Sequence, residues 1–394
     1  MPHFDYLIVG GGTVASFAAE GIRERDSIGT IGILSEETNP SYTGLANAES
    51  NWSDRNPIFD NSLFGMAGSS HAELHLDTRV TSIDRAGRSV STESGDTFDY
   101  GTLLLATDGR LRYLDLPADD RVIWFRTAQD YRRLRAICER HSHIAVVGGG
   151  YISTELTAAL AKHGCSVTLI YPEPVLGGAL FPAALAAGFE KRFADAGVTL
   201  RAGVTVVKGT ADASGITLAL DDGSRLTVDA VVSGLGIEPD IALAATAGLT
   251  TSDGIIVDSH LVTSDPHIYA AGDGAEYPDL MVGRRSVEHV DNSTSMGHTA
   301  GHNMAGAPEI YDHTPYYYSS IFGTRFEAVG TIDAGLDVLE DWILPGERGV
   351  VYYLGNGVLV GVLLWNLDGR LDDARRAIAA ASSLTRQDLP GLIR

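Results

Sequence analysis

The chain of 394 residues is 44% hydrophobic and 20% charged, which is typical of a globular protein with two or three domains. Its formal net charge of −22 argues against binding to nucleic acid or to an anionic membrane surface, and it weakens the case for an acidic electron-carrier protein as a partner. The sequence shows no signal peptide, no run of about 18 apolar residues and no CxxC or CxxxxC pair, so it predicts a cytoplasmic protein without a redox-active disulfide of these types.

Two similar segments organise the chain, one beginning at residue 4 and the other at residue 144. Each has a short β-branched strand, a glycine turn, an alanine-rich helix and a second strand. The segments read FDYLIVGGGTVASFAAEGI with IGTIGILSEE, and HIAVVGGGYISTELTAALAKHG with CSVTLIYPEP. Strand and helix periods that alternate in this way indicate parallel βαβ units. An antiparallel hairpin and a final apolar strand follow in both, so the sequence predicts an α/β fold with two Rossmann-like domains.

The later segments extend this organisation. Residues 240–310 read as a helix, the strands IIVDSHLVTS and IYAAGDGAEY, and a helix near Ser293–Met304, which together return to the first domain. From about residue 312, YYYSSIF, RFEAVGTID, GVVYYLGNG and VLVGVLLWN predict a separate antiparallel sheet, and LDDARRAIAAASS an amphipathic helix. Residues 39–70 are irregular and predict a long functional loop. Cys138, in a helical stretch, and Cys165, just before a strand, are both interpreted as structural.

The first glycine turn has the GxGxxA pattern of Gly10, Gly12 and Ala15 between a strand and a helix. The glycines let the backbone approach a pyrophosphate, and the start of the helix, at Thr13 and Val14, supplies free N–H groups and the positive end of the helix dipole. Glu36 and Glu37 end the next strand, about 20 residues beyond the turn, where an acid can bind ribose hydroxyls. This combination predicts a dinucleotide site.

The second turn carries Gly148, Gly150 and Ser153, and Glu173 ends the strand that follows. Serine replaces the third glycine, which normally allows close packing of helix and strand. No arginine follows the strand to bind a 2′-phosphate, so the sequence favours NADH over NADPH. A duplicated fold that has lost its nucleotide is the alternative. A third motif, TSDPHIYAAGDGAEY, ends a strand at Gly272 and Asp273, where an acid can accept hydrogen bonds from a polyol or a ribose.

These motifs and the segment GRRSVEHVDNSTSMGHTAGHNMAG make the chain resemble the FAD- and NAD(P)H-dependent pyridine nucleotide oxidoreductases over nearly its whole length. It most resembles the branch of apoptosis-inducing factor and the ferredoxin reductases, and ILSEET, LIYPEP, FEAVG and VLVGVLLWN add to the likeness. The resemblance implies an FAD enzyme with a discontinuous FAD-binding domain (1–113 and 237–311), an inserted NAD-binding domain (114–236) and a C-terminal α+β domain (312–394) that closes over the flavin.

The resemblance also implies roles for matching residues. Glu288 and His289 lie beside the flavin, with a helix after Asp291 pointing its N-terminus at it, and Asp273 binds the ribitol chain. Tyr151 and Glu155 flank the nicotinamide, and Tyr318 lies near the flavin. The other positions implied to contact a cofactor are Val80, Ala106, Thr107, Arg126 and Gly236.

The chain departs from the family pattern near the expected reaction centre. The family's arginine, prolines and lysine are replaced in the segment Tyr42–Glu49, and Glu49 stands about where the lysine would be. That lysine normally pairs with the glutamate that matches Glu155, which here lacks this partner. Asp108 adds another acid in the Ala106–Thr107 turn. More negative charge near a flavin disfavours its anionic reduced form, so we expect the redox chemistry to be altered. These changes lie near the expected reaction centre rather than at the FAD phosphates, so we expect FAD binding to persist.

The leading functional prediction is that NADH reduces FAD, which passes electrons to a small-molecule acceptor or a redox protein. One alternative is an FAD enzyme that converts a small organic substrate without NADH, and another is a redox sensor that holds a stable flavin–NADH complex. A homodimer is left open. His298 and His302 have the i,i+4 spacing of a metal-binding pair, but no third ligand is evident, so no metal site is predicted.

Overall fold

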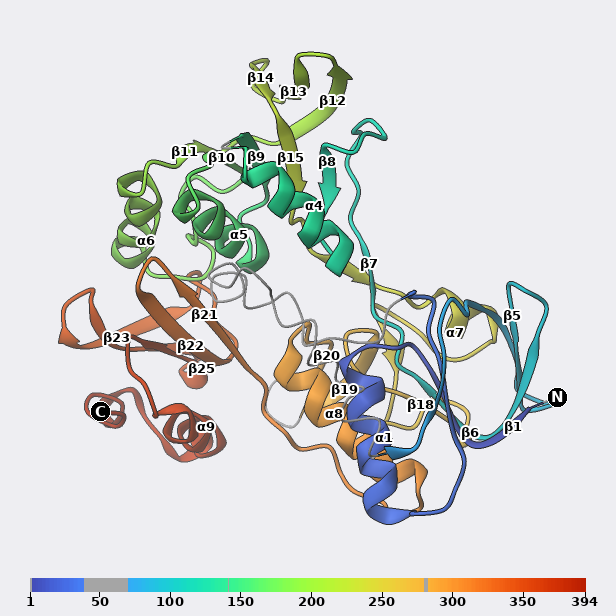
Figure 1. The fold of residues 1–394 in the computed structure, drawn as a ribbon. Coiled ribbons are helices and arrows are strands. Elements are labelled where there is room, and N and C mark those ends of the chain that lie inside the picture. Colours follow the sequence, from blue (N-terminus) through green and yellow to red (C-terminus); the bar gives the residue numbers. More distant parts are fainter. Residues whose placement is uncertain (1, 39–69, 141, 280–282) are drawn as a thin grey trace. The chain divides into compact units, whose positions relative to one another are not determined.

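The computed structural model describes residues 2–38, 70–140, 142–279 and 283–394. These residues form two compact units (Figure 1). The first unit comprises the described residues of 2–38, 70–110 and 238–316, and the second unit those of 111–237 and 317–394. The chain thus leaves the first unit and returns to it, as a nested arrangement requires. The three-domain division and its boundaries remain a prediction.

The first unit is built on a mixed sheet in the order β3-β2-β1-β6-β5-β4, with β18 also paired to β6. Strands β3, β2, β1, β6 and β18 run parallel, and β5 and β4 continue the sheet as an antiparallel hairpin. Leu7 and Ile8 of β1 are completely buried, as expected for a strand covered on both faces. The strands are β1 (His3–Val9), β2 (Ile31–Leu34), β3 (Glu73–His75), β4 (Val80–Asp84), β5 (Ser89–Thr92), β6 (Thr97–Leu105) and β18 (Ile268–Ala270).

Helices α1 (Thr13–Arg25) and α8 (Val290–Met304) lie side by side in the first unit, the blue and orange helices of Figure 1. Small residues allow this close approach. A Cβ atom at Gly297 would lie 2.6 Å from the Val14 carbonyl oxygen, and a Cβ atom at Gly301 would overlap the carbonyl oxygen of Ala18. The predicted helix near Ser293–Met304 is confirmed, and it begins three residues earlier than its predicted core.

The remaining elements of the first unit are short: α7 (Ala242–Thr246) and the strands β17 (Ile255–Ile256), β19 (Ala275–Asp279) and β20 (Gly283–Arg285). The strand predicted over IIVDSHLVTS is wrong beyond its first two residues. The Asp258 carboxylate accepts hydrogen bonds from the backbone N–H groups of His260 (2.8 Å) and Val262 (3.0 Å), which turns the chain out of the sheet.

The second unit contains a fully parallel sheet in the order β11-β10-β9-β15-β8, with a separate antiparallel sheet β12-β13-β14. This confirms the second Rossmann-like unit and the hairpin predicted after it. Its strands are β8 (Val122–Trp124), β9 (His143–Val147), β10 (Ser166–Tyr171), β11 (Thr199–Ala202), β12 (Val206–Asp212), β13 (Gly215–Leu220), β14 (Arg225–Val228) and β15 (Ala230–Ser233). Its helices are α4 (Ala128–Cys138), α5 (Tyr151–Lys162) and α6 (Ala183–Asp195). Two short strands, β7 (Gly109–Leu111) and β16 (Ile237–Pro239), pair where the chain passes between the units.

An antiparallel sheet in the order β21-β22-β25-β24-β23 completes the second unit and confirms the predicted C-terminal sheet. It packs on the segment before and within α6: Phe181 makes edge-to-face contacts with Phe326 and Trp365, both with centroids 5.3 Å apart. The Tyr353 hydroxyl also donates a hydrogen bond to the Leu180 carbonyl (2.8 Å). The elements are β21 (Tyr316–Ile321), β22 (Thr324–Gly330), β23 (Asp337–Leu344), β24 (Arg348–Gly355), β25 (Val358–Trp365), α9 (Leu371–Ala379) and two 3-10 turns, Ala381–Ser383 and Arg386–Asp388.

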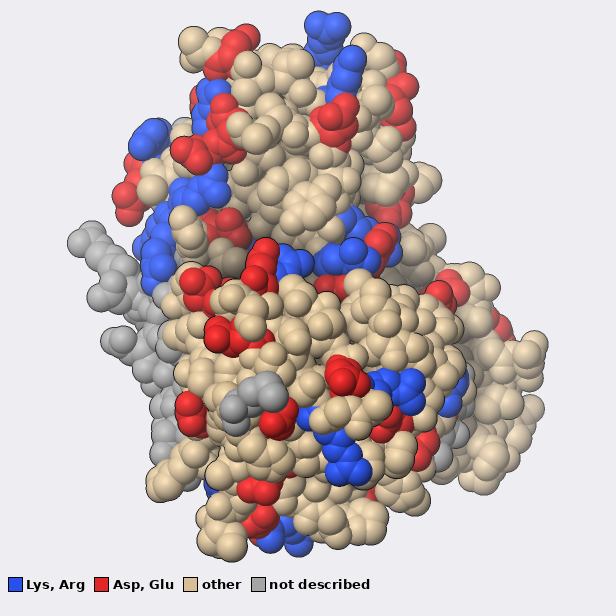
Figure 2. All heavy atoms as spheres, turned by 90° about the vertical axis from the view of Figure 1, so that its right-hand side faces the viewer, with Lys and Arg blue, Asp and Glu red and all other residues tan. Residues whose placement is uncertain are grey.

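Cys138, the last residue of α4, and Cys165, the residue before β10, are joined in a disulfide. Both are buried, in agreement with the structural role predicted for them. No helix among the described residues is long and apolar enough to cross a membrane. On the face drawn in Figure 2, acidic and basic side chains are interspersed, so the net negative charge does not make that whole face acidic.

Candidate functional site

The first glycine turn has the shape that a dinucleotide pyrophosphate requires. Gly10 has a φ of 115°, and a Cβ atom there would overlap the carbonyl oxygen of Ala106. Gly12 is the N-cap of α1, and no atom of the described residues lies within 4 Å of the place that its Cβ would take. Among these residues no side chain caps the helix, so its first N–H groups are left for a ligand. The residues present therefore fit the pyrophosphate of FAD.

The ends of three parallel strands meet at this turn. Ala106, just after β6, donates its N–H to the Val9 carbonyl (2.8 Å), and Thr107 continues the turn. Gly272 follows β18, and a Cβ atom there would lie 2.5 Å from Val14 of α1. The structure thus brings together Gly10, Val14, Ala106, Thr107 and Gly272, which the sequence had predicted from separate motifs.

The acids after β2 lie at the edge of this region. Glu36 and Glu37 are both exposed, and Glu36 forms an ion pair with Arg79 (3.8 Å), the residue before Val80. Backbone hydrogen bonds from Asp77 to Glu37 (3.1 Å) hold the two segments beside each other. Predicted ribose and adenine contacts therefore come from neighbouring segments, as binding one adenosine group requires.

Two other acids of the first unit, Asp108 and Glu288, act on Asp273. Burial, followed by repulsion from Asp108 and then Glu288, raises the pKa of Asp273 well above its ordinary value. The Ser293 hydroxyl donates a hydrogen bond to Asp273 (3.2 Å). Asp108, the acid added in the Ala106–Thr107 turn, therefore acts on the residue predicted to bind the ribitol chain. Ser293 was not predicted, although it lies within the VEHVDNS segment.

His289 is the N-cap of α8, so this helix begins at Val290 rather than after Asp291. The His289 Nδ1 atom accepts a hydrogen bond from the Asp291 N–H (3.2 Å), and burial lowers the pKa of the imidazole to about 4. The ring is therefore neutral at pH 7, and the first turn of the helix carries the acid Asp291. The Asp291 carboxylate is bound by His313 Nε2 (2.6 Å), a contact that no sequence motif indicated.

The second glycine turn repeats the first. Gly148 has a φ of 121°, and a Cβ atom there would lie 2.7 Å from both the Gly234 carbonyl and the Ser153 hydroxyl. Ser153 is fully buried and donates a hydrogen bond to Gly234 (2.9 Å), so it fits in place of the usual glycine. Within the described part of the chain, no other atom lies within 4 Å of the Cβ positions of Gly150, the N-cap of α5, and Gly236.

Glu173 lies against this turn with an unsatisfied oxygen. Its Oε2 atom is buried, has no hydrogen-bond partner among the described residues, and lies 2.8 Å from the Cβ position of Gly149. A buried acceptor without a donor is costly in a folded protein. The hydroxyl groups of a nucleotide ribose are donors of the required kind, so the residues of the second turn fit a second dinucleotide.

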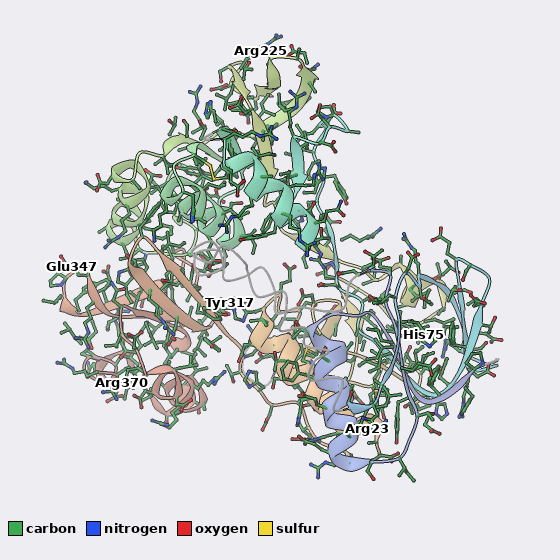
Figure 3. All side chains as sticks on the ribbon, in the orientation of Figure 1. Arg23, His75, Arg225, Tyr317, Glu347 and Arg370 are labelled. Carbon is green, nitrogen blue, oxygen red and sulfur yellow. A yellow bond between two sulfur atoms is a disulfide. The ribbon has the colours of Figure 1, made fainter. Side chains whose placement is uncertain are left out.

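Tyr151 and Glu155 lie one turn apart on α5 beside the C-terminal sheet; Tyr151 is half-buried and Glu155 is buried. The Tyr151 ring stacks on Tyr317 of β21 with centroids 6.1 Å apart and planes 6° apart. Tyr317 is labelled in Figure 3. The Ser319 hydroxyl donates a hydrogen bond to Glu155 (2.7 Å), while burial raises the pKa of this carboxyl to about 7. Residues of a strand alternate between faces, so Tyr318 lies on the other face of β21 from Tyr317 and Ser319. Sequence reasoning missed both of these contacts.

Arg126 and Glu49 are the remaining predicted residues. Arg126 precedes α4 in the second unit, where its N–H donates to Asp130 (3.3 Å), the acid of a capping box with Thr127. Glu49 and the rest of the predicted functional loop up to residue 69 lie outside the described residues.

Two glycine turns, each opening a helix and each followed by an acid at the next strand end, define a protein that binds two dinucleotides. A model of the pyridine nucleotide-disulphide oxidoreductases matches residues 4–297, and the chain belongs to this family. It is an FAD-dependent oxidoreductase that uses NAD(P)H. FAD supplies the redox chemistry, and the protein supplies binding, orientation and electrostatics.

Known relatives cover most of the chain. It is 36% identical over 342 residues to the ferredoxin reductase subunit of a 5,5'-dehydrodivanillate O-demethylase from a Sphingobium species, which covers 84% of this chain and 82% of that protein. It is 30% identical over 407 residues to a monodehydroascorbate reductase from Pisum sativum, covering 95% and 93%. A solved ferredoxin reductase from Rhodopseudomonas palustris matches with a TM-score of 0.86 and 29% identity, covering 94% of this chain and 93% of that one.

Proposed function

We propose that this protein is an NADH-dependent reductase that transfers electrons through FAD to a small iron–sulfur protein of the ferredoxin type. The observation that carries the proposal is the complete second nucleotide turn, with Glu173 presenting an unpaired carboxylate oxygen beside it. Two of the three relatives described above are named ferredoxin reductases, which supports the choice of acceptor.

Glu173 also supports NADH as the electron donor. A carboxylate at this strand end can accept hydrogen bonds from the two hydroxyls of the NADH ribose. The 2′-phosphate of NADPH would place negative charge against the same carboxylate, and each such repulsion costs binding energy. Replacement of Glu173 should therefore weaken NADH binding and narrow the difference between the two nucleotides.

The net charge bears on the protein acceptor. A ferredoxin that is itself acidic would be repelled by a uniformly negative surface, and the chain carries 51 acidic against 29 basic side chains. The interspersed charges in Figure 2 allow local complementarity on at least one face. We therefore expect the rate of electron transfer to depend on ionic strength, because charges at the edge of a protein–protein interface mainly change the rate of association.

The reductive step is tested by mixing the FAD-loaded protein anaerobically with NADH or NADPH and following the flavin absorbance. We expect NADH to bleach the flavin fast and NADPH at least about tenfold more slowly, as expected for one unfavourable charge contact of about 1.4 kcal/mol. In Glu173→Gln the preference should shrink, whereas Glu190→Gln, the matched change on α6, keeps an oxygen that can accept the hydrogen bond from the Tyr171 hydroxyl and should leave the preference intact.

The acceptor is tested by NADH-driven reduction of a [2Fe–2S] ferredoxin, compared with a quinone and with oxygen in the same assay. Turnover with ferredoxin well above turnover with the small acceptors supports the proposal. Fast bleaching of the flavin by NADH without reduction of ferredoxin would rule out ferredoxin as the acceptor and would still support an NADH-dependent reductase.

A second candidate is an FAD enzyme that acts on a small organic compound without NADH. The pairing of Glu155 with Ser319, in place of the family's lysine, favours it. Protein that holds FAD and is not bleached by either nucleotide would support this candidate. Slow bleaching that ends in a stable long-wavelength band would instead indicate a redox sensor.

A further inference from the structure

Glu24 of α1 meets His298 and His302 of α8 on the first unit. His298 Nε2 lies 3.2 Å from one oxygen of Glu24, and His302 Nε2 lies 2.8 Å from the other. The ligand atoms of all three side chains lie within 4.8 Å of one another. The sequence offered only the two histidines, and the structure adds the third ligand from a helix 274 residues away.

His302 lies between two carboxylates. Its Nδ1 atom lies 2.6 Å from a Glu309 oxygen, and its Nε2 atom faces Glu24, so both ring nitrogens point at carboxylates. A neutral imidazole has one N–H and can donate to only one of them. The other contact then sets a lone pair against a carboxylate unless the ring is doubly protonated or a cation lies between Nε2 and Glu24.

The geometry suits a metal ion in that position. In a tetrahedral zinc site with bonds of about 2.0–2.1 Å, neighbouring ligand atoms are about 3.3 Å apart. The observed nitrogen–oxygen separations of 3.2 and 2.8 Å are near this edge length. Glu309 holds the Nδ1–H of His302 in the way that an outer carboxylate orients a metal-bound histidine.

The fold builds this arrangement rigidly. A Cβ atom at Gly21 would overlap the backbone of His298, and Gly301 contacts Ala18 in the same way, so α1 and α8 cross at close range (Figure 1). His302 is 4% exposed, whereas His298 and Glu24 are open enough for an ion to enter. The three side chains are thus held by two helices whose N-caps are Gly12 and His289.

We propose that Glu24, His298 and His302 bind a divalent transition metal of the Zn²⁺ class and so clamp α1 to α8. Two imidazoles and one carboxylate suit Zn²⁺, whereas Mg²⁺ and Ca²⁺ favour oxygen ligands. Among the described residues, no fourth His, Cys, Asp or Glu belongs to the group, so water or the second oxygen of Glu24 completes the coordination.

The test uses untagged, FAD-loaded protein that has been stripped with a chelator and passed through a desalting column. Zn²⁺ is titrated calorimetrically, and Co²⁺ is titrated by its visible absorption, which reports four-coordinate binding. We expect one ion per chain, with a dissociation constant in the micromolar range or tighter, and a rise in the melting temperature with Zn²⁺.

Ligand and control variants separate this site from the other histidines of the chain, 12 in all. His298→Gln and Glu24→Gln should weaken Zn²⁺ binding at least about 100-fold, and Glu309→Gln about 10–100-fold through loss of the outer contact. Glu20→Gln, on the same helix, and His163→Gln, at the end of α5, should bind as the wild type does. FAD content and melting temperature without metal show that each variant is folded.

The proposal is overturned if wild type and His298→Gln bind Zn²⁺ alike, or if the wild type takes up no stoichiometric ion. The cluster would then be only a network of contacts among Glu24, His298, His302 and Glu309, and the melting temperature would not respond to Zn²⁺.

Discussion

The Ser319 hydroxyl of β21 donates a 2.7 Å hydrogen bond to the Glu155 carboxyl of α5. Glu155 is the position that pairs with a lysine in the family pattern, and here it is 7% exposed and bound by a neutral donor from the C-terminal sheet. Burial raises the pKa of Glu155 to about 7, and the Ser319 hydrogen bond opposes this rise.

The buried carboxyl should make stability depend on pH. Unfolded Glu155 loses its proton near its ordinary pKa of 4.5, whereas the folded group keeps it to about 7. Folded stability is therefore lost as pH rises between these values, by at most about 3 kcal/mol, and the full loss is present above pH 7. We expect Glu155→Gln to melt several degrees above wild type at pH 8, and the difference to shrink at pH 5. A difference that is the same at both pH values would contradict a buried proton on Glu155.

Removing the donor should have the opposite effect. Ser319→Ala leaves the charged form of Glu155 without its hydrogen bond, so its pKa rises further and the protein loses about 1–3 kcal/mol at pH 8. The loss should be smaller at pH 5, where the carboxyl is protonated, and Ser319→Thr should restore the stability at pH 8. Melting curves at the two pH values measure this, and an equal loss at both would indicate a packing defect only.

The glycines of the second turn should separate stability from nucleotide binding. Gly150→Ala places a Cβ atom where no atom of the other described residues lies within 4 Å. We therefore expect the free energy of unfolding without nucleotide to change by no more than about 1 kcal/mol. NADH affinity should fall at least tenfold, because the new atom takes the place needed by the pyrophosphate. Gly148→Ala should destabilise the protein itself by about 1–3 kcal/mol, since φ is 121°. Unchanged NADH affinity in Gly150→Ala, measured by titration, would argue against a nucleotide at this turn.

His289 predicts a second pH effect, of opposite sign. Its folded pKa of about 4 lies below the ordinary 6.5, so the unfolded chain binds a proton first and stability is lost as pH falls from 6.5 toward 4. His289→Asn keeps an N-cap acceptor and removes the titration. The difference in free energy of unfolding between this variant and wild type should be more favourable to the variant at pH 5 than at pH 8 by about 1–2 kcal/mol, after allowance for the partial exposure of His289. Parallel shifts at both pH values would show that folding does not lower the pKa of His289.

The aromatic cluster of the second unit is expected to decide its stability. Phe326 stacks on Trp365 with centroids 5.5 Å apart and meets Phe181 edge to face. Phe326→Ala should cost about 3–5 kcal/mol, and Phe326→Leu clearly less, because it leaves a smaller cavity. Thermal unfolding measures both, and a loss below about 1 kcal/mol in Phe326→Ala would mean that the cluster relaxes around the gap.

The sequence predicted those parts of the fold that short segments of the chain determine by themselves. Gly10 and Gly148 each follow a β-branched strand and precede an alanine-rich helix within about 20 residues, and local periods of strand and helix define such units without long-range information. The same locality explains why Glu36 and Glu173 were identified as acids at strand ends. The one clear error, the strand over IIVDSHLVTS, arose because the carboxylate of Asp258 binds backbone N–H groups that a strand would use.

Contacts between distant residues were decided only by tertiary structure. Tyr317, rather than Tyr318, faces Tyr151 because strand alternation and sheet packing select the face. Ser319 reaches Glu155 across 164 residues of sequence, and Glu24 reaches His302 across 278, through a helix crossing that glycines permit. Sequence therefore determined the family, the two nucleotide turns and their acids, because each is a local pattern of backbone shape. The partners of Glu155 and His302 depend on packing between elements, which no local pattern encodes.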